Sequence, residues 1–299
     1  MAARPSGDNM SPLSDLPQFK KMLDGYLSDK SKQRSPAVDL YTNSLRRKER
    51  EHIEAIFARL PESPYKREVQ DRLLLRDLGS YLGAWYELMV YDWLDRLDKN
   101  PTPEPAIPNS SGRPDFLIES SGLRIFIEVF VAQVSAEDEN VAGKARTVWP
   151  AATATFRRMG GRLEKKMGKY SQITQMPHTA YVICVCLESR LIELREVITF
   201  FLGNEVYNLQ TCRLEPALDG QIFERHAGEP PSAADYYRHV SALLVAKRFR
   251  DSIGSDYRIE FGLIQNPYAF TPIPETEFGY LRRYVVVSET ETLFTMKWV

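Results

Sequence analysis

The chain has 299 residues and 43% hydrophobic content, which allows one large domain or two small ones with a core of ordinary size. Its 39 Lys and Arg residues are balanced by 40 Asp and Glu residues, so the formal net charge is -1. This balance excludes a protein that attracts nucleic acid through its overall charge. Any nucleic-acid site must therefore be a local basic patch.

Cysteine usage and hydropathy together favour the cytoplasm. Cys184, Cys186 and Cys212 form neither a CxxC pair nor a zinc-binding pattern, and a low, odd cysteine count favours a reducing compartment. No stretch approaches the roughly 18 apolar residues of a membrane helix, and the N-terminus lacks the apolar run of a signal peptide. We therefore expect a soluble cytoplasmic protein with no membrane partner.

The N-terminal part of the chain predicts an arm followed by helices. Residues 1–36 are rich in Ser, Pro, Asp and Lys and predict a flexible arm, broken by a short amphipathic piece at 16–27. Residues 37–299 are predicted to form a single domain whose first part is helical. Apolar residues at helical spacing predict three helices, at about 47–60, 65–78 and 80–97.

A proline-rich link at 100–108 separates these helices from a region rich in predicted strands. The strands are expected at 115–119, 123–131, 180–187, 240–246 and 258–264, followed by an extended tail. Two further helices are expected between strands, a basic one at 151–170 and another at 192–202. This order predicts an α/β fold with a mixed β-sheet flanked by helices.

The first two predicted strands are joined by the turn signal Ser121-Gly122, which favours a β-hairpin. A loop centred on this dipeptide places Glu119 opposite Arg124, an opposite-charge pair. It also places Leu117 opposite Phe126, an apolar pair. Both pairs are favourable cross-strand partners, so they support this register.

The same register places Asp115 opposite Glu128, although like charges that face each other destabilise a hairpin. Glu128 lies in the run 125–131, which is apolar on both faces and typical of a central strand. An unpaired carboxylate there costs on the order of several kcal/mol. A shared proton, a salt bridge with Arg113, Arg124 or a helix cation, or a bound cation would each relieve this cost. Mg²⁺ suits the site, since it takes one or two carboxylates and keeps several waters.

Glu87 supplies a third carboxylate. It lies on a partly apolar flank of the helix predicted at 80–97, on the same side as Gly83, which permits close backbone approach. The alternative is that Glu87 is an ordinary solvated glutamate of a helix.

The three carboxylates occur in a fixed order: a Glu on a helix, then Pro-Asp, then twelve residues, then a second Glu. This order resembles that of the PD-(D/E)XK nuclease superfamily. The resemblance implies a restriction-endonuclease-like core with a helical N-terminal extension. It also implies that Asp115 and Glu128 bind Mg²⁺ or Mn²⁺, and that Glu87 joins them. A wider set of segments is similar to a group of uncharacterised bacterial proteins of this fold, namely 85–88, 113–116, 165–170, 181–185, 240–245 and 265–269.

The sequence departs from the family pattern at the motif lysine, which lies two residues after the second Glu. Here that position is Phe130, on the same face of the strand as Glu128. Either another element supplies the lysine or hydrolysis is lost. In this fold the helix after the metal-binding strand packs beside the site, so Lys166 and Lys169 are the candidate replacements. Arg158, Arg162, Lys165 and Lys169 recur at three- and four-residue spacing and form a basic stripe on this helix, beside Lys166. Arg158, Arg162 and Lys165 are candidate contacts to nucleic acid. The alternative is that the stripe is a solvated face.

The resemblance implies a Mg²⁺-dependent nuclease that hydrolyses phosphodiester bonds in DNA, with RNA less favoured. Asp115 and Glu128 would hold the ion, Glu87 would orient the attacking water, and Lys166 or Lys169 would stabilise the charge that builds on phosphate. One alternative is a catalytically degenerate scaffold that binds nucleic acid or protein. Another is an interaction protein that contacts a partner through residues 1–36.

Overall fold

The structure of the chain is a computed structural model. The described residues are 17–28, 35–75, 77–132, 162–163, 165–167, 169–170, 172–173, 176–188, 197, 205–208, 213–216, 238–250, 257–266, 269–274, 276–279, 281–290 and 293–298. Only the backbone is described for 17–18, 25–28, 205–208, 213–216, 250, 257, 282–290 and 293–298. The chain divides into two compact units, Met1–Asp92 with Phe249–Arg258, and Trp93–Arg248 with Ile259–Val299.

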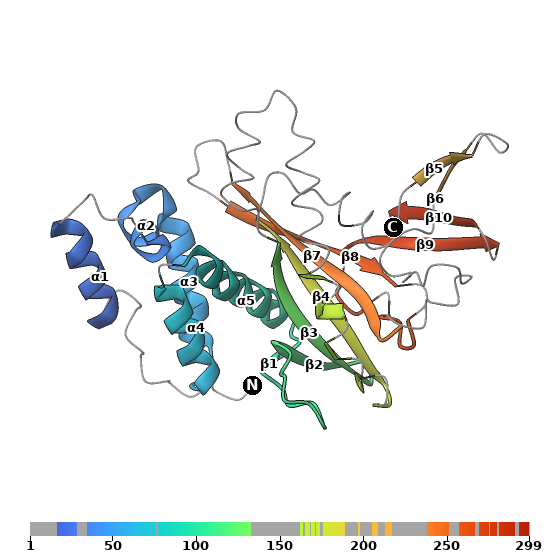
Figure 1. The fold of residues 1–299 in the computed structure, drawn as a ribbon, viewed down its shortest axis with the longest axis horizontal. Coiled ribbons are helices and arrows are strands. Elements are labelled where there is room, and N and C mark those ends of the chain that lie inside the picture. The colour runs from blue at the N-terminus through green and yellow to red at the C-terminus, as the bar shows by residue number, and fades with distance from the viewer. Residues whose placement is uncertain are drawn as a thin grey trace. The chain divides into compact units, whose positions relative to one another are not determined.

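The first unit is helical (Figure 1). Its helices are α1 (Pro17–Ser28), α2 (Pro36–Thr42), η2 (Ser44–Arg46), α3 (Arg47–Arg59), α4 (Pro64–Leu74) and most of α5 (Leu78–Arg96). The predicted helical N-terminal region is thus confirmed, with α4 ending four residues earlier than expected. The apolar face predicted for α3 is buried, as Ile53, Ile56 and Phe57 are at most 2% exposed.

Two of these helices begin with the same local device, a serine followed by a proline. Ser35 accepts a hydrogen bond from the Val38 amide at the start of α2, and Ser63 accepts one from the Lys66 amide at the start of α4. The serine oxygen satisfies an amide that has no partner inside the helix, and proline suits the first helical position because it lacks an N–H. The arm before α2 also packs. Phe19 of α1 is buried in a cluster with Ala37 and Leu74, and Met22 and Leu23 of the same helix pack against this cluster.

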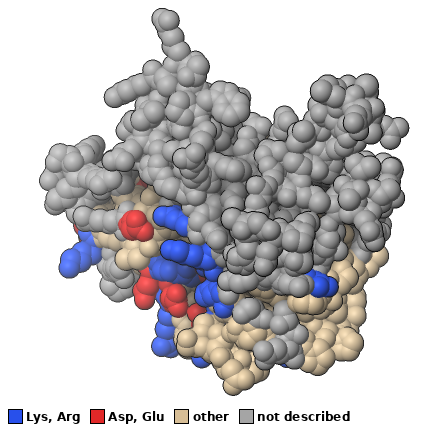
Figure 2. Space-filling model, turned by 45° about the vertical axis from the view of Figure 1, so that its right-hand side comes forward, with Lys and Arg blue, Asp and Glu red and all other residues tan. Residues whose placement is uncertain are grey.

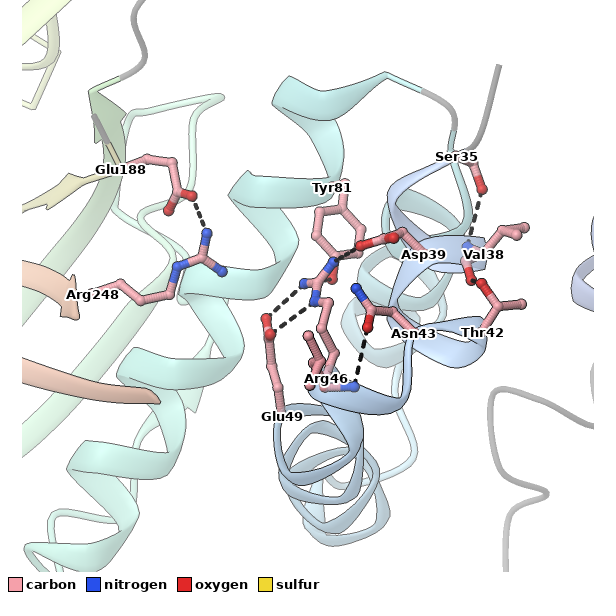
Figure 3. A network of polar contacts seen from close by, with 11 residues as sticks. Ser35, Val38, Asp39, Thr42, Asn43, Arg46, Glu49, Tyr81, Glu188 and Arg248 are labelled. Atoms are coloured by element: carbon pink, nitrogen blue, oxygen red, sulfur yellow. Dashed lines mark hydrogen bonds and ion pairs between the residues drawn. The ribbon is translucent and has the colours of Figure 1, made fainter. Parts of the chain in front are cut away.

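A buried polar network links α2, α3 and α5 around Arg46 (Figure 3). The Arg46 guanidinium donates to both carboxylate oxygens of Glu49, at 2.9 and 2.8 Å, and to Asp39 at 2.8 Å. It also donates to the Tyr81 hydroxyl at 3.4 Å. Burial alone would lower the pKa of Arg46, but Glu49, Tyr81 and Asp39 outweigh burial and raise it, so the guanidinium stays charged.

The second unit contains a mixed eight-stranded sheet in the described residues, with the order β1-β2-β3-β4-β7-β8-β9-β10 (Figure 1). Its strands are β1 (Thr102–Pro103), β2 (Phe116–Ser120), β3 (Leu123–Ala132), β4 (Thr179–Leu187), β7 (Val240–Arg250), β8 (Tyr257–Gln265), β9 (Arg282–Thr290) and β10 (Leu293–Trp298). β2 and β3 are antiparallel, whereas β3, β4 and β7 run parallel to one another. The chain therefore has the expected α/β fold.

The β2–β3 hairpin has the predicted register, with Glu119 opposite Arg124 and Leu117 opposite Phe126. Ser121 and Gly122 both have positive φ, 53° and 77°, as a two-residue hairpin turn requires. The prediction of this register is confirmed, and it determines which residues of the two strands meet.

The core of the second unit lies between the central strands and the described helical residues 162–163 and 165–167. Every residue of β4 is buried, as expected for a parallel strand covered on both faces. Leu163, Met167 and Tyr170 pack in one cluster with Phe126 and Phe130 of β3. Because alternate residues of a strand share a face, Glu128, between these two phenylalanines, also faces the helix.

Several elements were not expected from the sequence. A second sheet pairs β5 (Glu205–Asn208) with β6 (Arg213–Pro216) in a region expected to be a polar loop, and the extended tail forms β9 and β10. β5 and β6 have only four residues each, too few for an alternating pattern to identify a strand. Most of the helices predicted at 151–170 and 192–202 lies outside the described residues. In the described part of the chain, no helix is long and apolar enough to cross a membrane.

Candidate active site

Asp115 lies immediately before β2, one register place beyond the last described pair of the hairpin. Its Oδ2 accepts a hydrogen bond from the Val129 amide at 2.5 Å. The Arg124 amide donates to the carbonyl of His178, just before β4, so it points toward β4. Successive amides of a strand point to opposite sides, and the Val129 amide, five residues later, therefore points toward β2. β2 begins only at Phe116, so no backbone carbonyl of β2 pairs with the Val129 amide, and the Asp115 carboxylate accepts its hydrogen bond instead. Asp115 is thereby held next to Glu128.

Glu128, in the middle of β3, is the buried acceptor of two ammonium groups. Its carboxylate is 2% exposed. Oε1 accepts hydrogen bonds from both Lys166 and Lys169, the latter at 3.0 Å. Both candidate replacement lysines thus reach the carboxylate from the helix and the turn that follows it. Phe130, at the position of the motif lysine, is buried in the core.

The second oxygen of Glu128, Oε2, is buried and has no hydrogen-bond partner in the described structure. The same holds for the hydroxyl of Tyr170. Burial, and after it the charges of Glu128 and Asp115, raise the pKa of Tyr170. Burial and Glu128 likewise raise the pKa of Tyr181. Both carboxylates therefore lie close enough to these tyrosines to disfavour a further negative charge.

Glu87 belongs to the first unit, where it forms an ion pair. Glu87 Oε1 accepts from Arg72 Nη1 at 2.7 Å, and Oε2 accepts from Nη2 of the same guanidinium. Burial alone would lower the pKa of Arg72, but the hydrogen bond and charge of Glu87 outweigh it and raise that pKa. Glu87 is buried rather than solvated, and a buried fork-like pair accounts for a carboxylate there.

The basic stripe is partly described. Arg162 and Lys165 are exposed, and Arg158 lies outside the described residues. On the face shown in Figure 2, described Lys and Arg side chains lie directly beside Asp and Glu side chains. Positive charge on this face is therefore local, in keeping with the nearly neutral chain.

The donor set fits a hard divalent cation with two protein ligands. The available groups are the carboxylates of Asp115 and Glu128, and Glu128 Oε2 is a buried acceptor without a partner. Mg²⁺ accepts such an arrangement because it uses one or two carboxylates and keeps several waters. Among the described residues no group of three or more His, Cys, Asp or Glu side chains could hold a metal ion. A cation there would thus depend on two carboxylates.

Tyr170 and Gly112 complete the surroundings of the two carboxylates, and sequence reasoning did not single them out. A Cβ at Gly112 would lie 3.2 Å from Cε1 and 3.3 Å from the hydroxyl oxygen of Tyr170. Tyr170 follows Lys166 by four residues, the spacing that places side chains on one face of a helix. That spacing is the available signal, but it equally fits a core aromatic. Comparison with known proteins adds no assignment, since no family model, curated protein or solved structure matches the chain.

Proposed function

We propose that this chain is a cytoplasmic, metal-dependent nuclease of the PD-(D/E)XK type that hydrolyses phosphodiester bonds in DNA, with RNA the less favoured substrate. The observation that carries the proposal is the position of Lys166 and Lys169. Both reach Glu128 from the segment after β3, so lysine side chains are present although the motif position holds Phe130.

The two lysines supply hydrogen-bond donors for a phosphate group. Each ammonium has three donor hydrogens, and the bond to Glu128 Oε1 uses one of them. Lys166 is 31% exposed and Lys169 is 40% exposed, so substrate can reach both. Donors that are already in place when negative charge builds on a phosphate lower the barrier to its hydrolysis.

The carboxylates have two roles in the proposal. Asp115 and Glu128 would hold Mg²⁺ or Mn²⁺, which would supply Lewis-acid stabilisation of the phosphoryl oxygens. Their other role is to fix the lysines, since Glu128 binds both. Two carboxylates and two ammonium groups carry no net charge together, so a cation would make the site attractive to a phosphodiester.

A cleavage assay tests the proposal. Purified protein is incubated with single- and double-stranded DNA and RNA, in Mg²⁺ or Mn²⁺ and in EDTA. We expect cleavage that EDTA abolishes and that the double variant Lys166→Ala, Lys169→Ala loses on the order of 10²-fold or more. Lys165→Ala is the matched control and should weaken binding more than turnover. Cleavage that survives the double variant would contradict the assignment of the lysines.

The role of Glu87 in orienting water, which the resemblance implies, has its own test. Because both oxygens of Glu87 bind Arg72, this residue can orient water only after leaving that ion pair. Comparing Glu87→Gln with Arg72→Met separates the two roles. A role limited to the ion pair predicts that both variants lose stability to a similar extent. A role in the reaction predicts that only Glu87→Gln also loses cleavage per folded molecule.

One observation favours a second function, a nucleic-acid-binding module that does not cut. Glu128 is already paired with two lysines, so the buried charge is compensated without a cation. This alternative predicts binding in EDTA, by fluorescence anisotropy on labelled DNA, with no cleavage of any substrate. It also predicts that Arg162→Ala and Lys165→Ala reduce the salt dependence of binding.

A further inference from the structure

Two buried polar atoms of the candidate site have no hydrogen-bond partner in the described structure, Glu128 Oε2 and the Tyr170 hydroxyl oxygen. The Tyr170 side chain is 0% exposed. A buried hydroxyl without a partner is costly, and a phenylalanine ring would fill the same space without that cost. A tyrosine at this position therefore points to a use for its hydroxyl.

The Tyr170 ring is fixed by its neighbours. It packs edge-to-face on Tyr181, with ring centroids 5.5 Å apart, and Lys169 Nζ lies 4.8 Å from the Tyr170 centroid. Tyr181 in turn donates to the Lys166 carbonyl at 3.0 Å. Gly112 leaves room for the hydroxyl on the remaining side, since a Cβ there would be only 3.3 Å from it. The ring is thus held by Tyr181 of β4, by Lys169 of its own segment and by the backbone at Gly112.

The Tyr170 hydroxyl can act as a hydrogen-bond donor. A tyrosine hydroxyl carries one donor hydrogen and ionises only at about pH 10, so it can donate throughout the physiological range. An ionised carboxylate can only accept hydrogen bonds. Glu128 Oε1 already accepts from two lysines, whereas Oε2 has no partner in the described structure, so Oε2 is the carboxylate oxygen that is left to accept from the hydroxyl.

We propose that Tyr170 is a positioning residue of the site: its hydroxyl donates to Glu128 Oε2 and fixes the orientation of the carboxylate, while Lys166 and Lys169 hold Oε1. The inference rests on the proposed nuclease function and adds a residue to it. Tyr170 acts through Glu128 and makes no contact with substrate.

The variant Tyr170→Phe removes only the oxygen and keeps the ring contacts. We expect kcat for Mg²⁺-dependent cleavage to fall about tenfold or more, the scale of one hydrogen bond to a charged group, with KM for nucleic acid little changed. The Mn²⁺ concentration that gives half-maximal thermal stabilisation should rise. Tyr65→Phe, which removes a buried hydroxyl from α4 of the other unit, is the matched control and should leave both values unchanged.

A measurement without activity separates this inference from the proposed function. In protein labelled with ¹³C at tyrosine Cζ, the Tyr170 signal is assigned by its absence in Tyr170→Phe. In EDTA we expect that signal to shift in Glu128→Gln, whether or not the wild type cuts nucleic acid. An unmoved signal, or a Tyr170→Phe variant that behaves like Tyr65→Phe in metal binding, would overturn the positioning role. Absence of cleavage by the wild type would overturn only the nuclease function.

Discussion

Gly112 lies so close to Tyr170 that a side chain there would clash with the candidate site. A Cβ there would approach Tyr170 Cε1 to 3.2 Å and Lys169 Cε to 3.5 Å. We expect Gly112→Ala to lower the free energy of unfolding by about 1–3 kcal/mol, because the inserted methyl group must displace a packed ring. Gly83, inside α5, is the matched control. A Cβ there meets only Arg72 at 3.9 Å, so Gly83→Ala should stabilise by about 0.5–1 kcal/mol.

Urea denaturation of both variants checks this prediction. If the two variants changed the free energy of unfolding equally, or if Gly112→Ala raised it, the backbone at Gly112 would not pack closely against Tyr170 as described.

Tyr170 also predicts how stability depends on alkaline pH. Its pKa is raised above the ordinary value of 10.0, first by burial and then by Glu128 and Asp115. Above pH 10 the unfolded chain therefore loses a proton that the folded chain retains, and stability falls as pH rises. Tyr170→Phe should remove up to about 1.4 kcal/mol per pH unit from that slope. Urea denaturation between pH 9 and 11 measures it, and an unchanged slope would contradict the raised pKa.

At the scale of elements, the Arg46 network predicts a large difference between neighbouring arginines of one segment. Arg46 is buried with Glu49, whereas the pair of Arg47 and Glu51 is more than 60% exposed on both sides. Arg46→Ala removes the guanidinium that binds the buried carboxylate of Glu49, so we expect a loss of about 3–5 kcal/mol. Arg47→Ala should cost less than about 1 kcal/mol. Thermal and urea unfolding of the two variants gives the comparison, and similar losses would contradict the buried network.

The elements that could be predicted are those with a strong local signal. Four apolar residues at helical spacing located α3, and the dipeptide Ser121-Gly122 with its flanking pairs located the β2–β3 hairpin and its register. The seven-residue helix α2 is too short for periodicity, although Ser35 and Pro36 mark its start. β5 and β6 have four residues each, which is too short for a periodic pattern to stand out, whereas β10 alternates apolar and polar residues but was expected only as an extended tail.

The candidate site could also be predicted only where the sequence carries a local signal. The hairpin register implied that Asp115 and Glu128 meet, and helical spacing grouped Lys169 with Arg158, Arg162 and Lys165, with Lys166 adjoining them. The contact of Lys166 and Lys169 with Glu128 depends on how the helix packs on the sheet, which spacing alone does not determine. Tyr170 was missed because an aromatic residue on an apolar helix face has the pattern of an ordinary core residue.

For the whole molecule, the near-zero net charge means that any attraction of a polyanion must come from local groups of charge, such as the one around β3. In our proposal, Asp115 and Glu128 form a divalent-cation site there, beside two lysines. Cleavage assays depend on the choice of substrate, whereas cation binding does not. Binding of the cation is therefore the more direct test of the site.

The measurement is anomalous diffraction at the manganese absorption edge, from crystals soaked in Mn²⁺, for the wild type and for Asp115→Asn. This variant keeps a side-chain oxygen that can accept from the Val129 amide, so it removes the charge while preserving the local structure. In the wild type we predict an anomalous peak for a manganese ion within bonding distance of oxygens of both Asp115 and Glu128. In the variant we predict no peak. A wild type without a peak, with Lys166 and Lys169 still bound to Glu128, would contradict the account.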